Sequence, residues 1–535
     1  MKVVSHKEMC WRDDHEQVAY NQRVSRIRKH EYPMLRGLTY LDHGGTTLAS
    51  RSLMQSFCSE MQSTLLANPH SDASNPSNTA IMVEETRREV LRMFNADPAH
   101  FDVVFTANAT AAIKLVAEGF SGCRESFDYF YHRNSHTSLV GVRELAFHSH
   151  CFASNEEVSD WLSGTYDGLR DPQRPVLFAY PAQSNMNGER LPLEWAGKLR
   201  SSANHLKAYT LLDVAALVST TPLDLSNHFL APDFVTLSFY KIFGFPDLGA
   251  LIVRKAAGHV FDNRRYFGGG TTEMTTCFGD AWVALKDSSL HARLEDGTIA
   301  FRSILALNLA ITTHQDLFGG LEQVSKHTGW LANRLYQRLV NSRHSNNSPM
   351  YRIYKSEDSS YDDPQTQGAT IAFNFYRSDG SYVGPWHVGS FLRKHAIHVR
   401  TGTLCNPAGI SCALKLNSEW LRMAFERGYR CNTELDIVEG IPVGVVRITF
   451  GATNTIEDVE KLVSTLSQHI LQEEDHLQTV KRKRIGKKDS VMGYTESKLV
   501  VEDFEAKPSK DVSPRVRSRF YSLRRLLGHC REKML

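Results

Sequence analysis

Short apolar runs alternate with helical patterns from residue 40 to residue 253, and this alternation constrains the fold more than any other feature. Each run is apolar throughout, as expected for parallel strands with both faces buried. The first run is followed directly by an alanine-rich helical stretch at 109–119. The runs cover residues 103–106, 175–180, 209–213, 234–239 and 249–253. They predict a large, doubly wound, mostly parallel sheet covered by helices, an α/β fold.

The pattern changes after residue 299. A helical connection spans 299–340, separated strands follow at 369–376 and 445–450, and a helix runs from 456 to about 473. Because 535 residues are too many for one compact core, we expect a smaller α+β domain after the large one. The predicted divisions are an N-terminal extension at 1–36, a large domain at 37–310, a small domain at 311–474 on which the N-terminal segment is a candidate to pack, and a tail at 475–535.

The tail is polar and basic. Four consecutive basic residues, Lys481 to Arg484, precede Lys487 and Lys488, and little apolar periodicity follows before residue 520. Such charge runs are usually solvated, so we interpret the tail as a flexible linker, with a nuclear-localisation or acidic-partner patch as the alternative. The stretch 518–535 predicts a short basic amphipathic helix with phenylalanine and leucine side chains on one face.

Composition excludes several classes of protein. The formal net charge of +3 gives the whole molecule no strong field, so neither nucleic acid nor a membrane is an expected partner. The N-terminus becomes charged before an apolar signal region forms, and no apolar stretch is long enough to cross a bilayer. Nine cysteines without CxxC spacing indicate reduced thiols and no metal site. We therefore expect a cytoplasmic protein.

Lys241 stands just past the apolar run at 234–239 and is followed by a glycine turn at Gly244. Loss of hydration at the mouth of an apolar sheet lowers the pKa of an amine and favours the neutral form, which condenses with aldehydes. Taken alone, such a lysine is more often a solvated residue at a strand end. The polar residues that accompany it must decide between these interpretations.

Three more polar positions follow predicted strands. Asp213 ends the run at 209–213, where a carboxylate could keep a pyridinium nitrogen protonated or could simply be a cap. The segment from Thr106 to Ala112 opens a helix, so its backbone N–H groups and Thr110 could bind a phosphate, with an ordinary N-cap as the alternative. His136 could stack on a planar ring, although an isolated histidine is more often structural. Each of these residues has an ordinary interpretation, and only their occurrence together, in this order along the chain, is specific for a cofactor site.

Cys405 lies in a loop between predicted elements, with Arg400 five positions before it and Asn406 and Pro407 after it. A nearby guanidinium favours the thiolate, which is the reactive form of cysteine. An inert buried thiol is the ordinary interpretation of any one of nine cysteines, but the loop position indicates an accessible nucleophile. Cys412 is a candidate for a second relay thiol on proximity alone.

Several segments carry a family resemblance. Tyr40 to Thr47 is similar to the N-terminal signature of the class V aminotransferases, and Arg400 to Cys405 is similar to the cysteine loop of the cysteine desulfurases among them. The resemblance extends from residue 40 to residue 470, and it is greatest to the N-terminal desulfurase domain of eukaryotic molybdenum cofactor sulfurases. Segments 135–138, 222–226 and 238–246 carry that closer likeness. The fold implied is the type I fold of pyridoxal-phosphate (PLP) dependent transferases.

The resemblance implies a PLP enzyme, a sulfurtransferase that takes sulfur from L-cysteine as a persulfide on Cys405 and releases L-alanine. It implies Lys241, Cys405 and His136 as the catalytic residues. The cofactor-binding residues that it implies are Lys241 as the Schiff-base lysine, Asp213 on the pyridine nitrogen, His136 on the ring, Asn185 near the ring hydroxyl, and Ala109, Thr110, Ser238 and Tyr240 around the phosphate.

Substrate and subunit contacts are implied as well. Arg447 matches the arginine that grips the substrate carboxylate, a role suited to its planar pair of donors, with Arg400 and Asn185 also beside the substrate. Thr298 matches a threonine that family dimers lend to the phosphate site of the neighbouring subunit, so a homodimer is implied. The implied sulfur acceptor is the molybdenum cofactor or a separate carrier protein.

Four features depart from the family pattern. Asp213 to Ala216 lacks the glutamine that many desulfurases carry at the fourth position, as does the sulfurase branch. Asn108 replaces a common glycine, which we attribute to the tolerance of asparagine for left-handed backbone. The loop 245–249 looks one residue shorter than the sulfurase pattern, and we expect the placement of Lys241 to survive. Sulfurases usually continue into a molybdopterin-binding domain, so we expect desulfuration more firmly than cofactor sulfuration.

Two other interpretations stay open. A class V lyase or aminotransferase would keep the PLP site but act on another amino acid without persulfide transfer, and assays of alanine and persulfide separate it from a desulfurase. A catalytically inactive scaffold with a partner-binding tail is the third class. The intact Lys241, Asp213, His136 and Arg447 argue against that class, and absence of a visible cofactor absorption band would support it.

Overall fold

The computed structural model describes residues 14–71, 78–123, 126–164, 174–202, 207–431 and 433–468. The chain divides into two units, residues 1–476 and 477–535, and every described residue belongs to the first. The basic segment at 481–488, the helix expected at 518–535 and the end of the helix expected at 456–473 lie outside the described residues. The tail assignment therefore stays a prediction.

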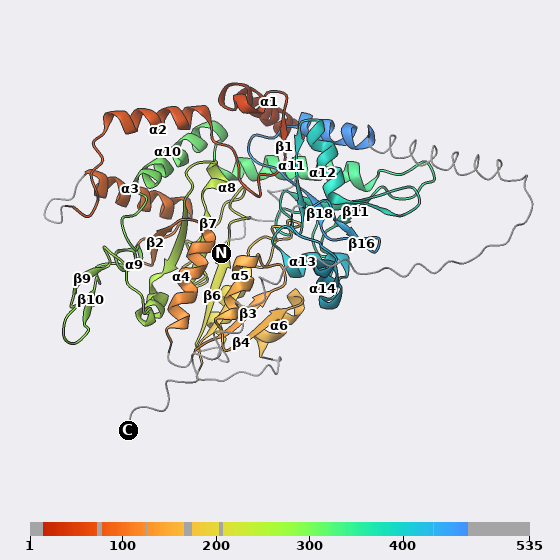
Figure 1. The fold of residues 1–535 in the computed structure, drawn as a ribbon. Helices are drawn as coiled ribbons and strands as arrows, with labels where there is room; N and C mark the ends of the chain where they lie inside the picture. The colour runs from red at the N-terminus through yellow and green to blue at the C-terminus, as the bar shows by residue number, and fades with distance from the viewer. Residues whose placement is uncertain are drawn as a thin grey trace, which may run out of the picture. The chain divides into compact units, whose positions relative to one another are not determined.

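Seven strands between residues 101 and 254 form one sheet (Figure 1). Six of them run in the same direction, and β8 is antiparallel to both of its neighbours, β2 and β7. The order across the sheet is β2 (Phe101–Thr106), β8 (Gly249–Arg254), β7 (Phe234–Ser238), β6 (Ala208–Asp213), β5 (Val176–Pro181), β3 (Asp128–His132) and β4 (His148–Phe152). The expected mostly parallel α/β sheet is confirmed, with all five predicted strands present.

Strand β5 shows why these runs are apolar throughout. Phe178 belongs to the core on one face of the sheet, with Trp195, whereas its neighbour Leu177 belongs to the core on the other face, with Phe120. Phe178 and Leu177 are both fully buried. Because burial of each such side chain contributes about 1.5–3 kcal/mol, both faces stabilise the strand.

Helices cover both faces of this sheet. Helix α3 (Asn78–Met93), α7 (Trp195–Ser201) and α10 (Phe301–Phe318) contribute to the first core. Helix α4 (Ala109–Ser121) and the 3-10 segment η4 (Lys255–Asn263) contribute to the second. This two-sided arrangement is the doubly wound layering that the sequence predicts.

The sequence pattern does not reveal β3 and β4. Strand β4 lies at the edge of the sheet with His148 and Ser149 exposed, so it has no continuous apolar run. Strand β3 begins with Asp128, a buried carboxylate that pairs with Arg174 at 3.1 Å. A polar residue with a tertiary partner interrupts the apolar pattern without interrupting the strand.

A second sheet is antiparallel and follows residue 350. Its order is β11 (Tyr351–Tyr354), β12 (Thr370–Tyr376), β18 (Val445–Thr449) and β15 (Arg400–Gly402), with β13 (Tyr382–Val383) paired to β12. Helices α11 (Leu321–Val340), α12 (Pro385–Lys394) and residues 456–468 pack on it around a core that includes Leu335, Phe373 and Leu462. Antiparallel strands with flanking helices are the α+β arrangement expected for this part.

The N-terminal segment lies against this second sheet region. Strand β1 (Thr39–Tyr40) pairs in parallel with β14 (Ile397–His398), and helix α1 (Asp14–Glu31) contacts α11. Arg28 of α1 pairs with Asp458. Because α10 runs through residue 310 and packs on α2 (Arg51–Ser63) and α3, we propose that the large domain extends to the end of α10.

The remaining elements connect the two sheets or project from them. They are η1 (Pro33–Leu35), α5 (Thr137–Val140), η2 (Gly141–Glu144), α6 (Asn155–Ser163), α8 (Tyr240–Phe243), β9 (Thr272–Thr275), β10 (Val283–Leu285), α9 (Leu290–Leu294), α13 (Pro407–Leu414), α14 (Ser418–Glu426), β16 (Ile437–Val438) and β17 (Ile441–Pro442). No helix within the described ranges is long and apolar enough to cross a bilayer.

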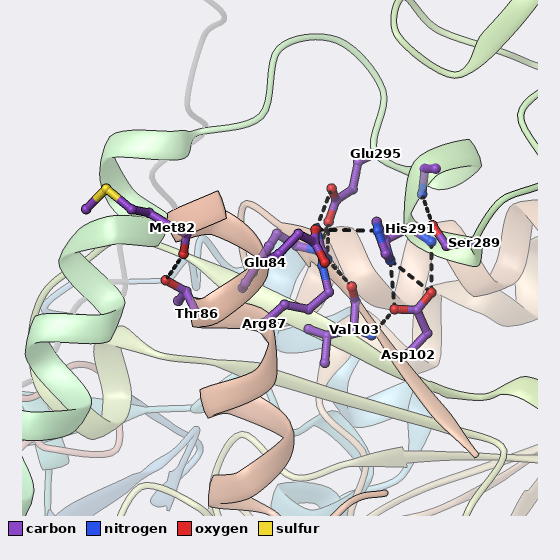
Figure 2. Close-up of polar contacts among 11 residues, drawn as sticks. Met82, Glu84, Thr86, Arg87, Asp102, Val103, Ser289, His291 and Glu295 are labelled. Atoms are coloured by element: carbon purple, nitrogen blue, oxygen red, sulfur yellow. Dashed lines mark hydrogen bonds and ion pairs between the residues drawn. The ribbon is translucent and has the colours of Figure 1, made fainter. Parts of the chain in front are cut away.

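A buried ionic network joins α3, β2 and the segment that follows α9 (Figure 2). Arg87 makes two hydrogen bonds to the Glu295 carboxylate, at 2.8 and 3.1 Å, and the Phe105 N–H donates to the same carboxylate at 2.7 Å. Beside them, His291 Nδ1 lies 2.8 Å from an oxygen of Asp102. Burial opposes ionisation of Asp102, but the hydrogen bond and charge of His291 outweigh it, so the pKa of Asp102 is lowered.

The Arg87–Glu295 pair should be sensitive to loss of one partner. In Glu295→Gln the buried Arg87 cation loses its counter-charge, and we expect the free energy of unfolding to fall by about 3–5 kcal/mol. Glu89→Gln is the matched control, because Glu89 pairs with an exposed Arg92 on the same helix and its loss should cost under about 1 kcal/mol. Urea unfolding followed by circular dichroism measures both, and equal losses would contradict the assignment.

Candidate active site

A cavity of about 420 Å³ lies where the carboxyl ends of the parallel strands meet the second sheet. In an open α/β sheet, ligands bind at this edge. Eleven of the twelve predicted site residues line it, and Thr298 does not. The eleven are Ala109, Thr110, His136, Asn185, Asp213, Ser238, Tyr240, Lys241, Arg400, Cys405 and Arg447.

Lys241 follows β7 on the short helix α8, as the sequence predicts. Burial lowers the pKa of its amine, and the charge of Arg447 adds to the effect, while Asp213 and Asp42 oppose it. Among the described residues, none hydrogen-bonds the amine or lies within ion-pair distance of it. The lowered pKa favours the neutral form of the amine, and no described neighbour occupies its lone pair.

The turn after Lys241 is tight. Gly244 has a φ of +77°, and a Cβ at this position would lie 2.2 Å from the carbonyl carbon of Leu48. The loop at 245–249 folds back so that the Phe239 N–H donates to the Leu248 carbonyl at 2.8 Å. Lys241 lies in the cavity wall, as expected.

Asp213 and His136 lie on the same cavity. Asp213 accepts the Ala215 N–H at Oδ1, 3.0 Å, and its Oδ2 has no hydrogen-bond partner among the described residues. His136 Nδ1 accepts the Ser138 N–H at 3.1 Å, which leaves the proton of the neutral ring on Nε2. Burial lowers the pKa of His136, and nearby Asp213 only partly opposes this, so the ring is neutral at physiological pH.

The start of α4 forms one end of the cavity. The Ala109 N–H donates to the Ser238 hydroxyl at 3.0 Å, and the Thr110 and Ser138 hydroxyls lie 2.8 Å apart. Asn108 caps the helix by accepting the Ala111 N–H at 3.0 Å. Asn108 does not adopt the left-handed backbone that its residue type suggested, because its φ of −172° is extended backbone. It stands there as an N-cap, and no left-handed tolerance is needed.

Arg447 and Arg400 are direct partners across β18 and β15. Arg447 is only 4% exposed, and it donates to Asp42 at 2.6 Å and to the Asn185 carbonyl at 2.9 Å. Its Nε is buried without a hydrogen-bond partner among the described residues. Burial lowers the pKa of Arg447, and Asp42 opposes this. Arg400 is exposed, so its charge faces the cavity mouth.

Cys405 lies between β15 and α13, as the sequence predicts, and its side chain is exposed. Its backbone carbonyl accepts the Thr137 N–H at 2.8 Å, so the loop is attached to the residue next to His136. The structure thus places an accessible thiol on the wall that also carries Lys241 and Arg447.

Thr298 lies elsewhere, on a separate cavity of about 710 Å³ that Arg264 and Asp296 also line. The Arg87–Glu295 network holds the chain three residues before it (Figure 2). Its expected contribution to a neighbouring subunit stays a prediction.

Sequence reasoning missed Gln183 and Asp42, which also line the cavity. Gln183 accepts the Arg190 Nε–H at 3.2 Å, which orients its amide so that the NH₂ group faces the Ala216 carbonyl at 3.4 Å. An amide therefore stands beside the position where Ala216 replaces the family glutamine. The missing glutamine was the signal that could have prompted a search for a substitute.

Residues 39–462 match the family model described as aminotransferase class-V. The chain belongs to the class V aminotransferase family. A molybdenum cofactor sulfurase of Aspergillus fumigatus is 49% identical over 453 residues, which are 84% of this chain and 54% of that protein. A molybdenum cofactor sulfurase of Neurospora crassa is 49% identical over 457 residues, which are 84% of this chain and 48% of that protein. The chain spans about half the length of these curated relatives.

A solved cysteine desulfurase from Thermococcus onnurineus NA1 superposes with a TM-score of 0.63 at 20% identity, covering 84% of this chain and 98% of that one. At this identity the likeness concerns the fold. The expected family and the expected type I fold are both confirmed for this chain.

The turn at Gly244 should be essential to the placement of Lys241. We expect Gly244→Ala to lower the free energy of unfolding by more than about 2 kcal/mol, because the added Cβ is strained by backbone and by contact. Gly141→Ala is the control, since its φ is −63° and no atom lies within 4 Å, so the change should stay within about 0.5 kcal/mol. Urea unfolding of both variants checks this, and a neutral Gly244→Ala would refute it.

Proposed function

We propose that this class V aminotransferase is a PLP-dependent cysteine desulfurase that takes sulfur from L-cysteine onto Cys405 and releases L-alanine. The observation that carries the proposal is that Cys405, Lys241 and Arg447 line one cavity. A nucleophilic thiol, an amine with a lowered pKa and a buried guanidinium are the groups that such a reaction needs. Relatives named molybdenum cofactor sulfurase support it.

The cavity residues fit PLP. Within the part of the chain that the structure describes, the Lys241 amine and one carboxylate oxygen of Asp213 have no hydrogen-bond partner. The start of α4, with the hydroxyls of Thr110 and Ser238, offers phosphate donors. We propose that Lys241 would hold the aldehyde carbon, Asp213 the pyridine nitrogen, His136 the ring face, and that Asn185, Ala109 and Tyr240 complete the site. When bound, PLP supplies an electron sink for negative charge that develops on the substrate.

The protein side chains then divide the work. Arg447 binds the carboxylate of L-cysteine through its planar donors and orients the amino acid. Lys241, with its lowered pKa, is the base that removes the Cα proton. The Cys405 sulfur, exposed on the cavity wall, attacks the substrate sulfur, so that an S–S bond forms as the Cβ–S bond breaks. Protonation of the carbon fragment gives L-alanine, and the sulfur stays on Cys405 as a persulfide.

The proposal extends to partners and place. The acceptor of the persulfide is the molybdenum cofactor, as the names of the relatives suggest, or a separate carrier protein. Thr298 supports a homodimer in which each subunit completes the phosphate site of the other. We propose that the enzyme acts in the cytoplasm.

Single-turnover assays test the reaction. We expect the wild type, loaded with PLP, to yield alanine and persulfide from L-cysteine in equal amounts. Lys241→Ala should lose both products and the borohydride-reducible link to the cofactor, whereas Cys405→Ser should lose the persulfide but still bind PLP. Cys58→Ser is the control, because Cys58 is also an exposed thiol but lies outside the cavity.

Two other outcomes of these assays would contradict the proposed desulfurase function. Wild-type protein that binds PLP but forms neither product would replace the desulfurase with a class V lyase or aminotransferase acting on another amino acid. Wild-type protein that shows no visible absorption band with PLP would favour the inactive scaffold.

A further inference from the structure

The loop that carries Cys405 has an unusual backbone. Leu404 and Cys405 have φ angles of +57° and +54°, the left-handed region that L residues rarely adopt. Neither is a glycine, and Leu404 is buried. Such a backbone persists only where the surroundings hold it in place. The neighbours of this loop must therefore supply the restraint.

Both N–H donors and the carbonyl oxygen of the Asn406 side chain are hydrogen-bonded. Its Nδ2 donates to the Asn134 carbonyl at 3.1 Å and to Asn185 Oδ1 at 3.0 Å. Its Oδ1 accepts the Gly409 N–H at 3.0 Å, which caps helix α13. The side chain is fully buried. One amide thus joins the loop that carries Cys405 to the segments that follow β3 and β5.

Two further bonds complete the attachment. Asn185 Nδ2 donates to the Leu404 carbonyl at 2.7 Å, and the Thr137 N–H donates to the Cys405 carbonyl at 2.8 Å. Asn185 also receives the Arg447 guanidinium at its own carbonyl, 2.9 Å. The loop is therefore fixed to the residues beside His136 and to the residue that Arg447 holds.

We propose that Asn406 is a positioning residue for sulfur transfer: acting through Asn185 and the Asn134 backbone, it keeps the Cys405 thiol at the cavity wall. The proposal rests on the proposed desulfurase function. Asn406 itself does not line the cavity, so its effect reaches the reaction only through the loop. These hydrogen bonds hold the left-handed backbone of the loop, and they thereby hold the Cys405 thiol at a fixed distance from the substrate site.

The chain offers a matched pair of substitutions. Asp can accept a hydrogen bond at a helix N-cap as well as Asn can, but its carboxylate donates none. In Asn406→Asp the cap of α13 survives and the two tethering bonds are lost. Asn417 caps the next helix, α14, by accepting the Trp420 N–H at 2.8 Å, and its side chain makes no other hydrogen bond among the described residues. Asn417→Asp therefore changes the same chemistry without a tether.

The experiment uses full-length, PLP-loaded enzyme. For Asn406→Asp we expect persulfide formation to slow about 100-fold, the effect of a reacting group misplaced by about 1 Å, with KM for L-cysteine and the cofactor absorption band unchanged. The rate at which iodoacetamide alkylates Cys405, followed by peptide mass spectrometry, should change as well. Asn417→Asp should match the wild type in every measurement. Unchanged persulfide formation and unchanged alkylation in Asn406→Asp would overturn the proposal.

A second variant covers the case in which Asn406→Asp does not fold. Thr137→Pro removes the N–H that binds the Cys405 carbonyl, and proline suits this first position of α5 because His136 before it is extended, with ψ of 152°. We expect the same loss of persulfide formation and the same change in alkylation, and wild-type values would reject the tether. If the wild type makes no persulfide, the desulfurase function fails, while the alkylation rates still decide whether the loop is tethered.

Discussion

Arg447 is a buried cation, and the arrangement of the cavity depends on how its charge is balanced. Its two hydrogen-bond partners, Asp42 and Asn185, come from the segments that follow β1 and β5. An unpaired buried guanidinium would cost several kcal/mol. The segment after β1 must therefore lie beside β18, and the bridge between Asp42 and Thr449 fixes it there. The ion pair between Arg447 and Asp42 therefore brings residues near both ends of the matched region, 39–462, to the same cavity.

Burial in the cavity also shifts the pKa of two other basic groups. It lowers the pKa of both Lys241 and His136, and the nearby carboxylates offset the effect only in part. A neutral His136 adds no positive charge to a cavity that Arg400 and Arg447 already line. The lowered pKa of Lys241 makes its neutral amine more accessible, and that is the form that acts as nucleophile or base. The cavity therefore concentrates basic groups while it limits their net charge.

The sequence predicts the large sheet and the residues that end its strands. Lys241 and Asp213 follow apolar runs, and parallel strands present their carboxyl ends at one edge, so their meeting could be expected. Cys405 and Arg447 lie more than 150 residues further along, and only the family resemblance brought them to the same cavity. No local pattern could have done so, because their approach depends on packing between the two sheets.

Other features could not be read from one sequence. Strand β4 lies at the edge of the sheet and is partly exposed, so it has no continuous apolar run. Asn108 has an extended backbone, although its residue type suggested a left-handed one. Gln183 gains its place beside Ala216 from Arg190, a contact between side chains that no periodicity records. These cases share a cause: tertiary partners, and not local preference, decide the conformation.

The cross-strand pairing of Arg400 with Arg447 sets the electrostatic field at the cavity mouth. Two like charges opposite each other disfavour the strand pair, and Asp42 relieves this by neutralising the inner one. The Arg400 guanidinium stays exposed and has no ion-pair partner in the described ranges, so its attraction extends into solvent over about a Debye length. In the proposed reaction, this field would turn the amino-acid substrate carboxylate first and guide it to Arg447.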